Sequence, residues 1–419
     1  MSRLIQIFEH ERLTLLPNER GENLLKKELE KLYLFNDSNN NEYFTGIRDG
    51  VKFTKYVGVI QIGGLTIEIL PKADKKSHAD KETYTKWRNV LLNMLAICRK
   101  IKVDSVSEAS LNKRYYSLLE LYFDLFLDEV LILLRKGLIK KYHFRSSNST
   151  ALKGCIQFNK NIQQNLIHQE RFYTTHQIYD YEHAVNQILL RALNILSKIV
   201  TNGNIKDRIA RIRLDFPDIK EIEITKTHFD NIKESRKTQA YNEALKIAKM
   251  IILNYSPDIK NGQEDMLALL FDMNKLWEEY VFLMLQRNKP SNIEVSFQNS
   301  QLFWESKTIR PDIIVNKKQG DKSETYVIDT KWKIIDYRNP SDDDLKQMYA
   351  YNLYWNAGKS MLLYPMVEKF PERYGKFHKG MSGDNRCKLG FINVLDENGK
   401  LDLLIGKEIL NKLNQLEKS

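Results

Sequence analysis

Two aspartates and a lysine have the types and the spacing that hydrolysis of a phosphodiester requires. Asp312 stands at the head of an apolar run, and Asp329 and Lys331 lie two positions apart in a second run, Tyr326 to Trp332. Because side chains alternate between the faces of a strand, Asp329 and Lys331 would point the same way. Carboxylates and an amine on one sheet face are costly to desolvate unless they pair or bind an ion. The pattern therefore predicts a cation site on a sheet.

The ions that suit such a site are Mg²⁺ or Mn²⁺, since hard divalent cations take oxygen ligands, commonly carboxylates together with phosphate and water. Asp312 and Asp329 would be the metal ligands, together with a main-chain carbonyl near Thr330. Lys331 would hold or deprotonate the attacking water, while the metal polarises the phosphoryl group and offsets its growing negative charge. A D-x-K triplet also occurs by chance in surface hairpins, so the surrounding segments must decide between these interpretations.

The surrounding segments contain the elements that would position this site. Residues Asn316 to Glu324 are polar and contain a glycine, which predicts a hairpin turn between the two strands. Ser341 and three following aspartates predict a helix N-terminus, because capping side chains and acids favour that end. Gln347 and Tyr351 stand four apart in this helix and would share one face. A further helix is expected before the strands, from Leu269 to Leu285.

In this order the segments resemble the PD-(D/E)xK nuclease superfamily. Pro311-Asp312 followed by Asp329-Thr330-Lys331 is similar to its signature. Gln347 with Tyr351 is similar to the QxxxY element that follows the catalytic strand in one branch of these nucleases. The resemblance implies a restriction-endonuclease-like domain with a mixed central sheet flanked by helices.

The resemblance also implies an acid near the metal on the helix that precedes the strands. Glu278 stands at the position where this fold often places such a residue, and the adjacent Glu279 is an alternative. The candidate catalytic set is therefore Asp312, Asp329, Lys331, Glu278, Gln347 and Tyr351.

The composition is that of a globular protein with an excess of positive charge. Of its 419 residues 42% are hydrophobic and 28% charged, and the net charge is +11. Such an excess suits a polyanionic partner, because each Lys or Arg on a phosphate releases counterions. A basic protein with no such partner would show the same charge.

Three cysteines far apart, at positions 98, 155 and 387, make a disulfide framework or a zinc finger improbable. The first residues lack the apolar core of a signal peptide. The most apolar stretch, Leu118 to Leu134, contains four acids, which argues against a membrane span. We therefore expect a cytoplasmic protein with no membrane contact. Ala357 to Ser360 ends like a phosphate-binding loop, but Leu353 replaces the first glycine, so we expect no nucleotide site.

The chain is expected to hold three regions of α+β character overall. Residues 1–75 read as a small β-rich domain, in which Gly63-Gly64 joins the strand-like runs Lys52 to Ile62 and Leu65 to Leu70. Residues 76–255 are rich in helical periodicity, and residues 256–419 would form the nuclease domain. The helix expected first, Asn18 to Lys31, precedes a polar loop at Asn36 to Asn41. The apolar runs LLYP and LGFINVL near the C-terminal end are expected to be edge strands.

Patches from about Tyr43 to Tyr351 resemble McrC, the nuclease subunit of methylation-dependent McrBC restriction systems. Cys155 stands where an arginine is expected in that family, so the role of this position is open. The similar patches are YVGVIQIGGLTIEILPK, Leu152-Lys153-Gly154, Tyr179-Asp180-Tyr181, Asn186 to Leu193 and FDMNKLWEEYV.

This resemblance implies a Mg²⁺-dependent DNA endonuclease subunit whose N-terminal and helical regions engage a hexameric AAA+ GTPase, McrB, and stimulate it. The motor would recognise methylated DNA and translocate it. Two alternatives stay open. One is a free-standing repair or recombination nuclease of the same fold, and the other is a non-catalytic activator of an AAA+ motor with a decayed acidic site.

Overall fold

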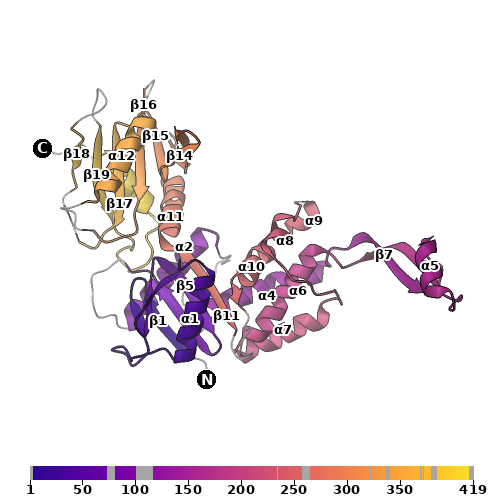
Figure 1. Ribbon diagram of the computed structural model, residues 1–419. Helices are drawn as coiled ribbons and strands as arrows, with labels where there is room; N and C mark the ends of the chain where they lie inside the picture. The colour runs from indigo at the N-terminus through magenta and orange to yellow at the C-terminus, as the bar shows by residue number, and fades with distance from the viewer. Residues whose placement is uncertain are drawn as a thin grey trace. The chain divides into compact units, whose positions relative to one another are not determined.

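A computed structural model describes residues 3–72, 81–100, 117–233, 235–256, 265–319, 322–335, 340–368, 370, 372–378 and 385–414 (Figure 1). The chain packs into two units, each assembled from separate segments. One comprises Met1–Arg3, Ile60–Thr66 and Tyr115–Leu269, and the other comprises Leu4–Val59, Ile67–Arg114 and Leu270–Ser419. The expected α+β class with mixed sheets is confirmed. The division into three consecutive domains stays a prediction.

The sheet that carries the candidate site has six strands. They are β12 (Ile293–Phe297), β15 (Ile313–Gln319), β16 (Lys322–Thr330), β17 (Lys359–Pro365), β19 (Arg386–Ile392) and β18 (Tyr374–Lys376), in this spatial order. β15 pairs antiparallel with β12 and β16, whereas β17 runs parallel to both β16 and β19. β18 closes the edge antiparallel to β19. The sheet is therefore mixed, as the resemblance implied.

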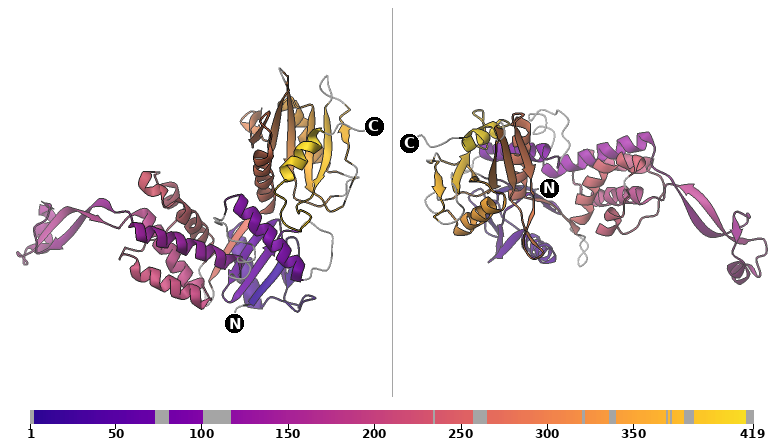
Figure 2. Two further views of the ribbon diagram at one scale, coloured as in Figure 1. Left: turned by 180° about the vertical axis from the view of Figure 1, so that it is seen from behind. Right: turned by 90° about the horizontal axis from the view of Figure 1, so that it is seen from above.

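Helices cover both faces of this sheet. Figure 1 shows α12 (Asp342–Tyr354) in front of the strands, and the view from behind in Figure 2 shows α13 (Ile405–Asn414) in front of them. α13 packs against α11 (Met273–Asn288), so these two helices share the face opposite α12. Beneath α12 lies an apolar cluster that includes Val327, Met348 and Tyr364. Alternation along β16 places Asp329 on the same face as Val327, beneath α12.

Three predictions about this part of the chain were wrong in extent. The turn expected at Asn316 to Glu324 is shorter, because β15 and β16 continue their register through Lys317 and Glu324 toward residues 320–321, which lie outside the described ones. The helix expected from Leu269 begins at Met273, since the preceding apolar residues form β11 (Met266–Asp272) and the Asp272 side chain caps the helix. The runs LLYP and LGFINVL are interior strands, because both β17 and β19 are paired on each side.

Within its described residues, the N-terminal segment forms the strands β1 to β6 and the helices α1 and α2. The hairpin expected around Gly63-Gly64 is confirmed, with Gly63 at φ 52°. Its first strand was wrong in extent, because the run from Lys52 is divided between β4, which ends at Phe53, and β5, which begins at Tyr56. The helix expected at Asn18 to Lys31 begins later and passes into the polar loop expected at Asn36 to Asn41, because Leu32 and Phe35 are buried on its inner face. The bounds are β1 (Arg3–Phe8), β2 (Arg12–Thr14), α1 (Lys26–Ser38), β3 (Phe44–Ile47), β4 (Gly50–Phe53), β5 (Tyr56–Ile62), β6 (Leu65–Leu70) and α2 (Lys81–Ile97).

The N-terminal strands belong to two further sheets. β1, β6, β5, β11 and β10 (Tyr255–Ser256) form a five-stranded sheet in that order, and β2, β4 and β3 form a three-stranded sheet. Strands β13 (Gln301–Trp304) and β14 (Lys307–Ile309) pair as a separate hairpin between β12 and β15 in the chain.

The first unit combines a helical bundle with a projecting β-ribbon. Ser117 caps α4 by accepting a hydrogen bond from the Glu120 amide, and Gly137 at φ 84° ends it. The region expected to be helical also contains a three-stranded sheet in the order β7-β9-β8, which the periodicity did not reveal. The bounds are α4 (Leu118–Lys136), β7 (Lys141–Ser149), β8 (Cys155–Ile156), α5 (Phe158–Asn165), β9 (Phe172–Asp180), α6 (Ala184–Ile199), α7 (Gly203–Asp215), α8 (Lys226–Asp230), α9 (Arg236–Gln239) and α10 (Asn242–Leu253).

Within the described residues, none of the helices has both the length and the apolar character that crossing a bilayer would require.

Candidate active site

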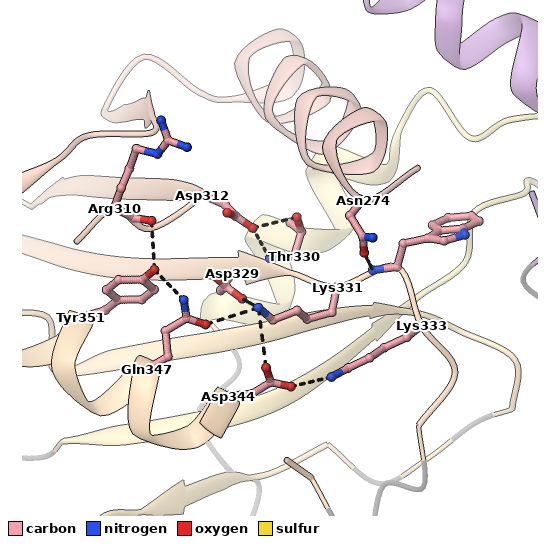
Figure 3. A network of polar contacts seen from close by, with 11 residues as sticks. Asn274, Arg310, Asp312, Asp329, Thr330, Lys331, Lys333, Asp344, Gln347 and Tyr351 are labelled. Atoms are coloured by element: carbon pink, nitrogen blue, oxygen red, sulfur yellow. Dashed lines mark hydrogen bonds and ion pairs between the residues drawn. The ribbon is translucent and has the colours of Figure 1, made fainter. Parts of the chain in front are cut away.

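Asp312 is fixed where two strands of the six-stranded sheet meet. It immediately precedes β15, and the register pairs Ile313 with Ile328. The strand expected at Tyr326 to Trp332 was wrong in extent, because β16 starts earlier and ends at Thr330, so Lys331 follows the strand. The Thr330 amide and hydroxyl both donate to Asp312 Oδ2, over 2.7 and 2.9 Å (Figure 3). These bonds hold one carboxylate oxygen and leave Oδ1 to face other groups.

Lys331 is the centre of a polar network that α12 completes. Its Nζ lies 2.7 Å from Asp329 Oδ2 and donates to Gln347 Oε1 over 3.3 Å (Figure 3). Gln347 Nε2 donates to the Tyr351 hydroxyl over 2.8 Å, and that hydroxyl donates to the Arg310 carbonyl over 2.9 Å. The shared helix face expected for Gln347 and Tyr351 is therefore confirmed, and it lies over Lys331.

The two adjacent glutamates of α11 have different partners in the structure. Glu278 is buried and accepts a hydrogen bond of 2.7 Å from Gln298 Nε2, close enough to Asp312 and Asp329 to interact with both. Glu279 instead pairs with Lys100 over 2.8 Å. Glu278 is therefore the glutamate of the pair that joins the carboxylate cluster.

Burial and mutual repulsion perturb every acid of this cluster. Burial, followed by the charge of Glu278, raises the pKa of Asp312 to about 6. Burial, followed by the charge of Asp312, raises the pKa of Asp329 to about 7. The pKa of Glu278 is raised in the same way by burial, against the hydrogen bond from Gln298. Three acids that resist simultaneous ionisation mark a place where added positive charge would be stabilising.

In contrast to the acids, Lys331 is shifted toward its charged form. Burial lowers its pKa, but the neighbouring carboxylates, Asp329 first, outweigh burial, so the net shift is upward. The lysine is therefore held as an ammonium ion. Of the two roles expected from the sequence, this state favours holding an oxygen atom over removing a proton.

Comparison with known proteins identifies the family of the chain. A family model described as McrBC 5-methylcytosine restriction system component matches residues 51–365. The chain belongs to this family. The Type IV methyl-directed restriction enzyme EcoKMcrBC of Escherichia coli (strain K12) is 24% identical over 184 residues, which are 43% of this chain and 52% of that protein. The chain thus matches about half the length of this curated relative.

Two solved structures from Thermococcus gammatolerans share the fold. One, a half-complex of McrB AAA+ hexamers with bound McrC, contains a chain 19% identical to this one with a TM-score of 0.69, and the match covers 98% of this chain and 99% of that one. The other, a McrBC complex, contains a chain 18% identical with a TM-score of 0.50, covering 68% of this chain and 88% of that one.

The donor set of this McrBC-family site fits a hard divalent cation. Its oxygens come from Asp312, Asp329 and Glu278, and the buried Asp329 Oδ2 has the Lys331 ammonium 2.7 Å away. Carboxylate oxygens are the ligands that Mg²⁺ prefers. Asp312 and Asp329 would hold the ion, and Glu278 is placed to contribute through water.

Several residues of the site were missed by sequence reasoning. Gln298, which orients Glu278, adopts φ 48°, and nothing in its sequence context indicates this left-handed conformation. Asp344 lies 3.7 Å from Lys331 and 2.7 Å from Lys333, although the sequence suggested only a helix-end acid. For Thr330 the sequence suggested only a nearby main-chain carbonyl as a metal ligand, and the bonds from its amide and hydroxyl to Asp312 were not foreseen.

Proposed function

We propose that this chain is a Mg²⁺-dependent DNA endonuclease subunit of a modification-dependent restriction complex, acting in the cytoplasm. The observation that carries the proposal is the Lys331 network, in which Asp329 and Gln347 from different elements converge on one ammonium group. The first turns of α12 and the end of β16 thus contribute side chains to one network beside the buried carboxylates. Burying several acids together raises their pKa values and destabilises the fold. A catalytic or metal-binding function would account for this arrangement, whereas a decayed site would not.

The residues have separate roles in this proposal. When bound, the metal would supply Lewis-acid stabilisation of the phosphoryl oxygens. Asp312 and Asp329 would hold it, and Thr330 fixes the Asp312 carboxylate. Lys331 donates a hydrogen bond to the attacking water or to a phosphate oxygen, and Gln347 with Tyr351 restricts the position of its ammonium group. Glu278, held by Gln298, would accept a proton from a water molecule at the site.

We propose further that the chain engages a hexameric AAA+ GTPase and stimulates it, and that the GTPase recognises methylated DNA. The ribbon of β7 and β9 supports a protein contact, because it carries large exposed aromatic side chains. Tyr142 and Phe144 are 61% and 74% exposed, and Tyr142 stacks on Tyr179 with ring centroids 4.4 Å apart. Exposed aromatic groups of this kind are typical of protein interfaces.

Plasmid cleavage tests the proposal. Wild type, Asp329→Ala and Lys331→Ala are each incubated with Mg²⁺, with and without the candidate GTPase, GTP and methylated sites. We expect cleavage only in the complete mixture, lost in both variants while GTP hydrolysis is still stimulated. Cleavage of unmodified plasmid by the chain alone would favour the free-standing nuclease. Variants as active as wild type would overturn the site, and stimulation without cleavage would favour the non-catalytic activator.

A further inference from the structure

A groove of about 740 Å³ opens beside the carboxylate cluster, between the β13–β14 hairpin and α12. Gln347 and Tyr351 line it, and both also belong to the network around Lys331. The groove therefore leads directly to the site where the phosphodiester would be cleaved. This inference rests on the proposed nuclease function.

The charge of the groove is opposite to that of the cluster. Its lining contains Arg310 and Lys346 and no acidic residue. Arg310 is exposed, and its side chain makes no hydrogen bond or ion pair to the part of the chain that the structure describes, although its charge lowers the pKa of Glu278 (Figure 3). Lys346 pairs only loosely with Asp343, over 3.6 Å between side chains that are 77% and 93% exposed. Both cations are thus available to an anionic ligand at little desolvation cost.

The hairpin adds an aromatic wall. Phe303 lines the groove, is 50% exposed, and rests with one side against Tyr354, with ring centroids 5.7 Å apart. The Tyr354 hydroxyl also donates to the Phe303 carbonyl over 3.3 Å, which fixes the hairpin to α12. A supported aromatic ring beside two cations has the composition of a single-strand nucleic-acid groove, in which phosphates bind the cations and bases stack on rings.

We propose that this groove binds the DNA strand on one side of the cleaved phosphodiester, with Arg310 and Lys346 on backbone phosphates and Phe303 stacked on a locally unpaired base. The backbone at Arg310 is held by Tyr351, whose hydroxyl donates to its carbonyl. The same tyrosine therefore positions both the phosphate-binding arginine and the Gln347 that contacts Lys331.

The proposal predicts binding without metal or cleavage. Anisotropy of a fluorescein-labelled single-stranded oligonucleotide, and of the corresponding duplex, is measured in EDTA with the full chain over a range of salt concentrations. Arg310→Ala and Lys346→Ala should each weaken single-strand binding on the order of tenfold and lower the log–log salt slope by about 0.7. Lys407→Ala is the matched control, since Lys407 is exposed on α13 at the opposite face of the sheet and should change neither quantity.

Stacking is tested separately from charge. Phe303→Leu should weaken single-strand binding on the order of tenfold with the salt slope unchanged, whereas Phe303→Tyr should bind as wild type does. Circular dichroism confirms that each variant is folded. Groove variants that bind like wild type, or a Lys407→Ala defect of equal size, would overturn the inference. If the groove variants cleave plasmid at the wild-type rate, the DNA-binding role of the groove is wrong. If Lys331→Ala alone loses cleavage, the proposed nuclease function is still supported.

The competing occupant is a second copy of this chain. Leu302 and Trp304 of the same hairpin are 69% and 62% exposed, which also suits self-association. Sedimentation velocity of wild type and Phe303→Leu distinguishes the two occupants. A dimer that becomes monomeric in the variant, with DNA affinity unchanged, would overturn the proposal. An unchanged sedimentation coefficient with weakened DNA binding is the result that the proposal predicts.

Discussion

The Trp332 indole nitrogen donates a hydrogen bond of 2.6 Å to Glu9 Oε1, joining two buried residues 323 positions apart in the chain. The Lys72 amide donates to the same oxygen over 3.1 Å. Trp332 directly follows Lys331, and its own amide donates to Asn274 Oδ1 over 3.3 Å. The N-terminal segment therefore helps to fix the backbone beside the candidate catalytic lysine.

Glu9 is expected to make stability depend on pH. Burial raises its pKa to about 8, so the folded state favours the protonated acid. Because the pKa is higher in the folded state, this contribution to stability is present at low pH and is lost as pH rises from about 4.5 through 8. Glu9→Gln keeps the acceptor for Trp332 and should flatten the decline of melting temperature between pH 6 and 9. Glu9→Ala should destabilise the protein by about 1–3 kcal/mol at pH 6.

Thermal melts of the Glu9 variants at several pH values test this expectation. Glu30→Gln is the control, because Glu30 is exposed on α1 and its substitution should leave the pH profile unchanged. Parallel pH profiles for wild type and Glu9→Gln would show that Glu9 is ionised in the folded protein.

Asp329→Asn is expected to stabilise the metal-free protein at alkaline pH. Burial raises the pKa of Asp329 from 3.8 to about 7, so stability falls as the pH rises through this range, and the full penalty is present at pH 8. The neutral amide removes this penalty but also removes the partner of Lys331, which leaves a net gain of about 1–2 kcal/mol at pH 8. In wild type Mg²⁺ should raise the melting temperature at pH 8, and in the variant this rise should disappear.

Differential scanning fluorimetry with and without Mg²⁺ measures both effects of the Asp329 substitution. Asp343→Asn removes an exposed carboxylate from α12 and should respond to Mg²⁺ like wild type. An Asp329→Asn variant that is still stabilised by Mg²⁺ would locate the metal elsewhere.

Lys331 is expected to be required for the chemical step. Lys331→Ala removes a charge-assisted hydrogen bond from the site and should lower the single-turnover cleavage rate by about 10²–10³-fold in the complete system. Lys333→Ala is a close control, since Lys333 lies two positions further on and pairs with Asp344. Equal losses for the two lysines would indicate a general effect of charge instead of a specific role for Lys331.

Tyr351→Phe is expected to loosen the network while preserving the core. The ring is only 4% exposed and stays packed, but Gln347 loses its acceptor and the Arg310 carbonyl loses its donor. We expect a loss of about 1–2 kcal/mol in stability and a cleavage rate lower by about tenfold. Tyr349→Phe, on the same helix, should leave the cleavage rate unchanged, and a comparable loss there would point to helix packing as the cause.

The sequence by itself determined the residues whose relation is local. The proximity of Asp329 and Lys331 agrees with the alternation expected for residues two apart, although β16 ends at Thr330, and the shared face of Gln347 and Tyr351 follows from helical spacing. The position of α12 after the second strand followed from Ser341 at its N-cap and the three acids of its first turn, although the Ser341 side chain makes no capping hydrogen bond. These patterns depend on backbone geometry over a few residues, which the order of residue types reveals directly.

Only the tertiary structure decided which distant groups meet. Glu278 joins the cluster while Glu279 pairs with Lys100, although the two stand side by side in the chain. Gln298 reaches Glu278 from a left-handed turn, and Glu9 reaches Trp332 across almost the whole chain. Such contacts depend on how elements pack against one another, and because packing joins side chains at any separation, no spacing in the sequence records them.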